Sequence, residues 1–273
     1  MGEDLLRVAV LALVEGLSEF LPISSTGHLI VGKSLLGFDA LGTVFEIVIQ
    51  IGAVCALILY YRKSLRAQAA QFRVNAEVRR FWQLILVACL PAVALGLLLE
   101  AQIESALFTP QVVALALIAG GIALLLVEHF LRGRSLGESR ALHFDELTMR
   151  QALIVGTVQA LALIPGVSRS GSSIVGGLLA GLNRRAATEF SFYLAIPLLG
   201  GTTVYKLVKS LPLLGADELL LLAVGAALSG FFAWLAIDWL LGYISRHSFA
   251  IFGVYRIVAG ALILLAVAGE VIV

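Results

Sequence analysis

Charged residues are scarce in this sequence: Asp, Glu, Lys and Arg make up 14% of its 273 residues, whereas 60% are hydrophobic. The mean hydropathy is +1.01. A soluble domain of this size keeps about a quarter of its residues charged, so composition excludes a soluble fold and predicts an integral membrane protein. The net charge of +1 says little about partners. No nucleic-acid partner is expected, and no room is left for a sizeable soluble domain.

Alternating strand patterns are also missing, whereas apolar runs of about 20 residues recur, which favours a helical bundle over an outer-membrane barrel. The start of the chain lacks the basic region of a secretory signal. Glu15 interrupts its apolar segment before any cleavage site, so we expect the segment to be retained. Cys55 and Cys89 lie inside apolar segments and match no metal motif. We predict that both are small core residues.

Six apolar segments are long enough to cross ~30 Å of hydrocarbon at ~1.5 Å per residue. They cover residues 43–61, 81–99, 111–130, 186–208, 218–241 and 250–272. The sequence therefore predicts an all-α polytopic membrane protein with six transmembrane helices and a single membrane domain over residues 1–273.

Two further apolar stretches, residues 5–36 and 151–182, are interrupted by polar sequence with proline and glycine. The first contains EGLSEFLPISSTGH, and the second contains PGVSRSGS. Each arm is too short to cross comfortably, and the polar middles could not face lipid without unsatisfied backbone groups. We therefore predict two re-entrant helix–loop–helix hairpins that enter the membrane part-way and return to the same side.

The distribution of basic residues predicts the orientation, because cytoplasmic loops carry an excess of Lys and Arg. Following the six crossings places thirteen basic residues on the cytoplasmic side: Arg62, Lys63, Arg66, Arg73, Arg79, Arg80, Arg132, Arg134, Arg140, Arg150, Arg184, Arg185 and Arg246. Only four fall outside: Arg7, Lys33, Lys206 and Lys209. The first hairpin then opens to the outside and the second to the cytoplasm, so their polar tips approach the midplane from opposite faces.

The two hairpins also share a weak sequence similarity. An offset of 144 residues superposes Ser24 on Ser168 and Gly27 on Gly171. Together with the opposite orientations, this pattern predicts an inverted-topology repeat, in which broken helices meet at a central site. The repeats are predicted to cover approximately residues 1–130 and 150–273.

Glu15 and Glu19 are one helical turn apart inside the first hairpin. They share a helix face, and two ionised carboxylates there are costly in a low-dielectric setting without a proton or cation between them. Acids inside a membrane are candidate functional residues. A divalent cation, Mg²⁺ or Ca²⁺, would relieve the repulsion if substrate phosphate completed its ligand shell. The alternative is a structural pair bound to backbone or to Arg169.

The segment SSTGH follows and begins a renewed helical stretch. Ser24, Ser25 and Thr26 add hydroxyls to the free backbone N–H groups of a helix start, beside Gly27. This combination predicts an anion site. Ordinary capping explains one hydroxyl but not three. His28, beside two acids and three hydroxyls, is placed for proton transfer.

The second tip supplies Arg169, whose planar fork fits a phosphate or pyrophosphate. Its alternative role is a plain ion pair with one of the two glutamates. Ser168, Ser170, Ser172 and Ser173 add donors at another helix start. Acids from one tip are thus expected to meet an arginine and hydroxyls from the other.

Five other polar residues of the apolar segments are predicted to make packing or interfacial contacts rather than to join the site. They are Glu46, Gln50, Glu189, Asp238 and Arg256.

The two tip motifs resemble those of the bacterial undecaprenyl-pyrophosphate phosphatases, the bacitracin-resistance proteins. The likeness extends to FEIVIQIGA at residues 45–53 and EFSFYLAIP at residues 189–197, and covers nearly the whole chain. The resemblance implies hydrolysis of undecaprenyl pyrophosphate to the monophosphate, which recycles the lipid carrier of cell-wall synthesis and confers bacitracin resistance. It also implies a bacterial inner (plasma) membrane location, a site open toward the periplasmic face, a divalent metal requirement and a homodimer.

Matched by position, the family's motifs imply two essential carboxylates, a nucleophile, a proton-transfer partner and two phosphate-binding residues: Glu15, Glu19, Ser25, His28, Arg169 and Ser168. The family usually has threonine where this chain has Ser173, and the hydroxyl is retained. The hypothesis leaves open whether Ser25 or a water attacks phosphorus. The alternative function is a polyprenyl-phosphate transporter, which the midplane site and inverted repeat also suit.

Overall fold

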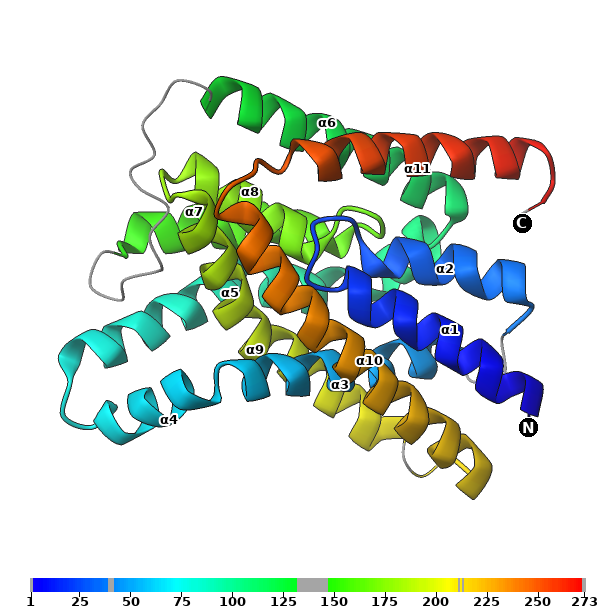
Figure 1. Cartoon of the computed structure of the whole chain (residues 1–273), viewed down its shortest axis with the longest axis horizontal. Coiled ribbons are helices and arrows are strands. Elements are labelled where there is room, and N and C mark those ends of the chain that lie inside the picture. Colours follow the sequence, from blue (N-terminus) through cyan, green and yellow to red (C-terminus); the bar gives the residue numbers. More distant parts are fainter. Residues whose placement is uncertain (1, 39–41, 132–146, 211, 213, 272–273) are drawn as a thin grey trace.

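A computed structural model describes residues 2–38, 42–131, 147–210, 212 and 214–271 of the chain (Figure 1). All regular elements in these ranges are helices. They are α1 (Gly2–Ser18), α2 (Ser25–Leu36), α3 (Gly42–Tyr60), α4 (Arg62–Gln71), α5 (Ala76–Leu107), α6 (Pro110–Leu131), α7 (Met149–Ala160), the 3₁₀ turn η1 (Leu161–Leu163), α8 (Arg169–Leu179), α9 (Arg184–Ser210), α10 (Ala216–Ile244) and α11 (Ala250–Ala268).

The prediction of an all-α polytopic membrane protein is confirmed. Each of the six predicted crossings coincides with a helix, and five of these helices, α5, α6, α9, α10 and α11, are long and apolar enough to cross a membrane. The number rises to six if α3 and α4 form one span, bent by 70°. Of the cytoplasmic cations used for the orientation, Arg132, Arg134 and Arg140 lie outside the described residues.

The two interrupted stretches form helix pairs. α1 packs on α2 and α7 packs on α8, and in each pair a short connection reverses the chain. We name these connections tip 1 (residues 19–24) and tip 2 (residues 164–168). The helices of both pairs are shorter than the five spanning helices, as re-entrant hairpins require.

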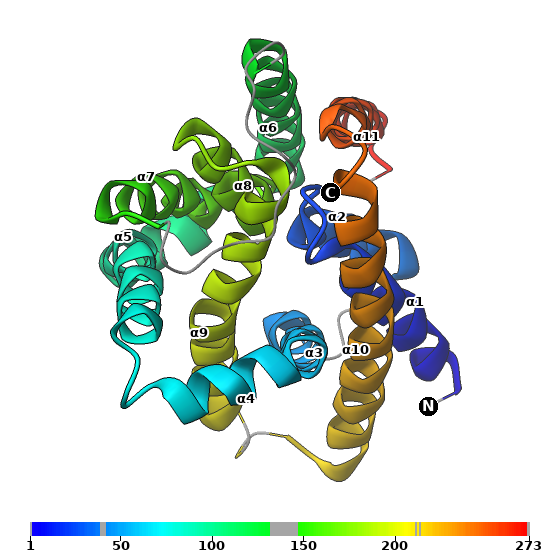
Figure 2. The same ribbon diagram turned by 60° about the vertical axis from the view of Figure 1, so that its left-hand side comes forward.

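Helix contacts recur between the two halves of the chain. α1 packs on α10 as α7 packs on α5, and α3 packs on α10 as α9 packs on α5. Figure 2 shows α3 between α9 and α10. α6 and α11 lie alongside one another (Figure 1). These pairings support the predicted inverted repeat over residues 1–130 and 150–273, which stays a prediction.

Close helix contact is clearest between α6 and α11, where glycines face each other. A Cβ added to Gly121 would lie 2.6 Å from the carbonyl oxygen of Gly253, and one added to Gly253 would lie 2.9 Å from that of Gly121. Small residues let membrane helices approach closely enough for van der Waals contact, which replaces the hydrophobic effect in lipid. This contact fixes α11 next to the tips.

Glu128 joins three segments near the end of α6. Its buried carboxylate accepts hydrogen bonds from Arg184 of α9 and from the backbone N–H of Phe249, 2.8 Å away, at the start of α11.

The two cysteines were predicted to be small core residues. This prediction is correct for Cys89, which is buried, and wrong for Cys55, which is exposed on the surface of α3. Periodicity alone did not separate the outer face of that uniformly apolar helix from its inner face.

Candidate functional site

The two tips meet in the middle of the molecule. The hydroxyl of Ser170, at the start of α8, donates to the carbonyl oxygen of Leu21 in tip 1 at 2.7 Å. Phe20 packs edge-on against Phe192 of α9, with 5.3 Å between ring centroids. Segments about 150 residues apart in sequence are therefore in direct contact, as the sequence predicted.

Each tip ends in a serine that begins a helix with an unusual backbone. Ser24 has φ 71° and Ser168 has φ 73°. Each side chain accepts a hydrogen bond from a backbone N–H three residues on, that of Gly27 at 3.4 Å and that of Gly171 at 3.1 Å. Non-glycine residues rarely adopt positive φ, and where they do the strain is commonly part of a functional site.

A cavity of about 170 Å³ lies between the two tips. Its apolar wall includes Phe108, Leu163 and Leu199. Seven polar residues line it: Glu19, Ser24, Ser25, Thr26, Gln50, Ser168 and Arg169. A small site with an apolar wall and convergent polar groups suits a ligand with a polar head and an apolar remainder.

Glu19 lies at the centre of the polar groups. Its Oε2 accepts a hydrogen bond from the Ser25 hydroxyl at 2.5 Å, and its Oε1 lies 3.4 Å from Nη2 of Arg169. Both ionised side chains are nearly buried, at 10% exposure for Arg169 and 5% for Glu19. An acceptor on the serine hydroxyl and a cation beside it are the parts that an activated nucleophile and an anionic substrate require.

Arg169 is held from a second side by Ser191 of α9. Nη1 donates to the Ser191 carbonyl oxygen at 3.1 Å and approaches its hydroxyl at 3.4 Å. Nε is buried and has no partner among the described residues. The arginine is thus fixed on one side, and its unpartnered Nε–H is a candidate donor to a ligand.

Glu15 is fully buried, and neither of its carboxylate oxygens has a hydrogen-bond partner in the described part of the chain. A buried carboxylate without a partner is costly unless a proton or a cation neutralises it. No group of three or more His, Cys, Asp and Glu side chains that could hold a metal exists among these residues. The site therefore fits a hard divalent cation only as a partial set of ligands, with Glu15 supplying the free oxygens and a bound phosphate completing the shell.

Six residues that the sequence placed in the site do not line the cavity: Glu15, Gly27, His28, Ser170, Ser172 and Ser173. Glu15 is the buried carboxylate described above, and Ser172 lines a second cavity, between α6, α7 and α8. The hydroxyl of Ser173 donates to the hydroxyl of Ser191, which is itself a partner of Arg169. Ser170 bonds to tip 1, as described above. Gly27 packs against α6: an added Cβ would lie 3.1 Å from Val113. His28 turns toward Tyr255 of α11, with Nε2 2.6 Å from its hydroxyl.

Sequence reasoning missed two residues near the cavity. Gln50, interpreted as a packing residue of the first crossing helix, lines the cavity. Its intramembrane amide was the available signal, since such groups are costly without a role. Ser191 carried no signal, because one serine in a buried helix is ordinary and its contact with Arg169 depends on tertiary structure.

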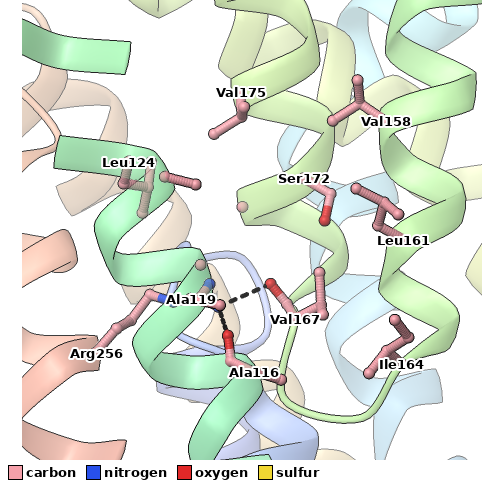
Figure 3. A pocket seen from close by; sticks show the side chains of 13 residues that line it. Ala116, Ala119, Leu124, Val158, Leu161, Ile164, Val167, Ser172, Val175 and Arg256 are labelled. Carbon is pink, nitrogen blue, oxygen red and sulfur yellow. Dashed lines mark hydrogen bonds between the residues drawn. The ribbon is translucent and has the colours of Figure 1, made fainter. Parts of the chain in front are cut away.

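A second cavity, of about 290 Å³, lies between α6, α7 and α8 (Figure 3). Its lining is almost wholly apolar, with Val158, Leu161 and Val175 on one side and the guanidinium of Arg256 at its base. It shares only Ile164 with the first cavity, so tip 2 separates the two. We place the candidate active site in the smaller cavity because the ionisable and hydroxyl groups converge there.

A sequence profile of the family described as bacitracin resistance protein BacA matches residues 8–262. The chain belongs to this family. Among similar proteins, the undecaprenyl-diphosphatase of Acidovorax ebreus is 50% identical over 261 residues, which cover 95% of this chain and 94% of that protein.

Two other relatives, both named undecaprenyl-diphosphatase, come from Albidiferax ferrireducens and Variovorax paradoxus. They are 49% and 48% identical, again over 95% of this chain and 94% of their own. The predicted family is therefore confirmed. The relatives' names support the hydrolase hypothesis and give no support to the transporter alternative.

Proposed function

We propose that this protein is a membrane phosphatase that hydrolyses undecaprenyl pyrophosphate to undecaprenyl phosphate and inorganic phosphate. The observation that carries the proposal is the group Ser25–Glu19–Arg169, buried between two hairpin tips in a chain of the BacA family. Hydrolysis would return the lipid carrier to cell-wall synthesis and would account for resistance to bacitracin.

The pyrophosphate would bind between the tips. Arg169 offers a bidentate fork for phosphate oxygens, and the backbone N–H groups at the starts of α2 and α8 add donors that favour an anion. The hydroxyls of Ser24, Thr26 and Ser168 line the same cavity. Phosphoryl transfer depends mainly on such positioning and charge stabilisation.

In the proposed reaction Ser25 attacks the terminal phosphorus. Its hydroxyl proton passes to Glu19, the acceptor 2.5 Å away, and the bond to the bridging oxygen breaks, which releases undecaprenyl phosphate. Water then cleaves the phosphoserine and releases inorganic phosphate. In the alternative, a water held beside Glu19 attacks phosphorus directly, and no covalent intermediate forms.

A divalent cation, Mg²⁺ or Ca²⁺, is part of the proposal. Glu15 and Glu19 would hold it together with phosphate oxygens, and it would supply positive charge next to the pyrophosphate. What supports it is the buried Glu15 carboxylate, whose oxygens have no partner in the described ranges.

We propose that α4 lies in the cytoplasm, as the distribution of Lys and Arg indicates. The family resemblance implies in addition the bacterial inner membrane and an active site open to the periplasmic face. A cysteine at the exposed Arg66 should resist a membrane-impermeant maleimide in intact spheroplasts, and one at Asp217 should react. The reverse pattern would contradict this orientation. A homodimer, which the family resemblance implies, stays a prediction.

Phosphate release by the purified protein in detergent tests the function. We expect release from undecaprenyl pyrophosphate with Mg²⁺ or Ca²⁺ present, and much less from inorganic pyrophosphate, which lacks the lipid tail. No release from the lipid with either cation would refute the proposal.

A further inference from the structure

α11 places two consecutive side chains against the tips. The first, Arg256, is 1% exposed and donates to the backbone of both tips: to the carbonyl of Pro22 in tip 1 at 3.2 Å, and to those of Gly166 and Val167 in tip 2 at 3.0 and 2.9 Å. Figure 3 shows its guanidinium reaching Val167 and Ala116. One side chain thus bridges both connections.

All of the acceptors of Arg256 are backbone carbonyls. Besides the tips, it donates to Ala116 at 3.2 Å and Leu117 at 3.3 Å in α6. No salt bridge to it occurs within the described residues. Burying a cation without a carboxylate partner is expensive. Arg256 does not line the cavity between the tips, and the cavity that it does line, between α6, α7 and α8, is otherwise almost wholly apolar. Its role is therefore more consistent with holding the backbone than with binding a ligand.

The neighbouring residue, Tyr255, acts on tip 1 through His28. The imidazole and phenol rings stack, with 5.6 Å between centroids, and Nε2 lies 2.6 Å from the hydroxyl. Nδ1 lies 2.7 Å from the carbonyl oxygen of Ser24. Because a carbonyl only accepts, Nδ1 carries the hydrogen, and in the neutral ring Nε2 accepts from Tyr255. Both ring nitrogens are therefore occupied away from the cavity.

We propose that Tyr255 and Arg256 are positioning residues that hold the two hairpin tips at a fixed separation, and that His28 serves the same purpose by donating to Ser24. We call these three residues the tip clasp. The proposal rests on the proposed function. It assigns His28 a structural hydrogen bond in place of proton transfer.

The clasp matters because the cavity is built from groups on different tips. Glu19 and Ser25 belong to the first hairpin and Arg169 to the second, so catalysis depends on the distance between hairpins. A misplacement of about 1 Å can reduce turnover about 100-fold. The clasp fixes that distance without touching the substrate.

Arg256→Gln and Arg256→Lys test the contact between Arg256 and the two tips. Neither side chain can span the five carbonyls, so we expect kcat to fall at least 30-fold, roughly the effect of a sub-ångström to 1 Å misplacement, with a smaller change in KM. Hydrogen exchange of peptides covering residues 19–28 and 164–172 should accelerate, with exchange in α5 unchanged. Wild-type kcat together with unchanged exchange at the tips would overturn the proposal.

Substitution of a neighbouring glycine tests the same contact while Arg256 itself is retained. A Cβ on Gly120 would lie 2.6 Å from Cζ of Arg256, whereas one on Gly201 would meet nothing within 4 Å. Gly120→Ala should therefore reproduce the loss in kcat and the faster exchange at the tips, and the control Gly201→Ala should not. Equal behaviour of the two variants would count against the clasp.

Asparagine and glutamine separate the two roles of His28. The amide of His28→Asn can replace Nδ1–H as donor to Ser24, whereas that of His28→Gln occupies the position of Nε2. Neither transfers a proton near neutral pH. We expect His28→Asn to retain most turnover and the wild-type shape of the pH–rate profile, and His28→Gln to lose turnover. Loss of turnover in both, with unchanged exchange at the tips, would restore the proton-transfer role and overturn the assignment.

Hydrogen exchange at the tips can be measured without any substrate. If the wild type releases no phosphate, the proposed function fails while the clasp is still tested. If the wild type is active and Arg256→Gln changes neither turnover nor exchange, the clasp alone fails.

Discussion

Ser24 and Ser168 adopt the same backbone conformation at equivalent points of the two hairpins, with φ 71° and 73°. Each serine caps a helix, through Gly27 and Gly171 respectively. A non-glycine residue in this region costs about 1–3 kcal/mol. Both helix starts that face the cavity are therefore held by a strained serine.

Ser168→Gly should relieve strain, since glycine adopts positive φ freely and replaces a capping serine at a cost of a few tenths of a kcal/mol. We expect the free energy of unfolding to rise by about 1 kcal/mol while turnover falls. Ser168→Ala keeps the strain and loses the cap, so it should lower the free energy of unfolding by about 1 kcal/mol. Thermal unfolding in detergent compares them, and equal stabilities would show that the position is not strained.

Arg169→Lys retains the charge and loses the planar fork that contacts Glu19 and Ser191. We expect kcat to fall on the order of 100-fold or more, with a melting temperature close to that of the wild type. Arg185→Lys is the matched control, because Arg185 pairs with Glu189 at 3.0 Å and is 37% exposed. Wild-type turnover in Arg169→Lys would remove this residue from phosphate binding.

Ser25→Ala decides between serine and water as the nucleophile. If serine attacks, kcat should fall on the order of 10³-fold, and the double variant with Glu19→Gln should be little worse than the more damaged single variant, because groups that act as a unit are not additive. Single-turnover phosphate release from all three variants measures this. Near-normal release from Ser25→Ala would make water the attacking group.

Chelation tests the cation. Treatment with EDTA should abolish phosphate release, and Mg²⁺ or Ca²⁺ should restore it. Glu15→Gln should raise the cation concentration needed for half-maximal rate at least tenfold, since it removes one charged ligand. Full activity of the wild type in excess EDTA would instead indicate that a proton neutralises Glu15.

Glu128→Gln should affect stability and leave chemistry unchanged. The carboxylate accepts hydrogen bonds from Arg184 and from the backbone of Phe249, so the variant should lose about 3 kcal/mol of unfolding free energy. Glu128 does not line the cavity between the tips, so kcat per folded molecule should be unchanged. Glu77→Gln, at an exposed position, should change stability by less than about 0.5 kcal/mol.

The helices and hairpins could be predicted because a bilayer imposes strong rules on sequence. Runs of about 20 apolar residues are visible without an alignment, and a proline or glycine among hydroxyls marks where a buried chain turns. The meeting of Glu19 with Arg169 followed from topology, since acids and a cation on opposite tips must neutralise one another in lipid.

The clasp could not be predicted in this way. The sequence showed Arg256 as a polar residue of the last apolar segment, and nothing local indicated that its acceptors are carbonyls of both tips. The sequence placed His28 beside two acids and three hydroxyls, as a candidate for proton transfer, whereas its ring stacks on Tyr255 of α11. Side-chain direction at a helix start depends on the residues around it, which come from distant parts of the chain.

The bridge that Arg256 forms also bears on biosynthesis. The ribosome makes α11 after both hairpins, so a nascent chain holds Glu19, Ser25 and Arg169 before it has the residue that ties their connections together. Newly inserted hairpins should therefore have little activity until the last helix docks on α6. Catalysis would thereby be coupled to completed assembly of the membrane domain.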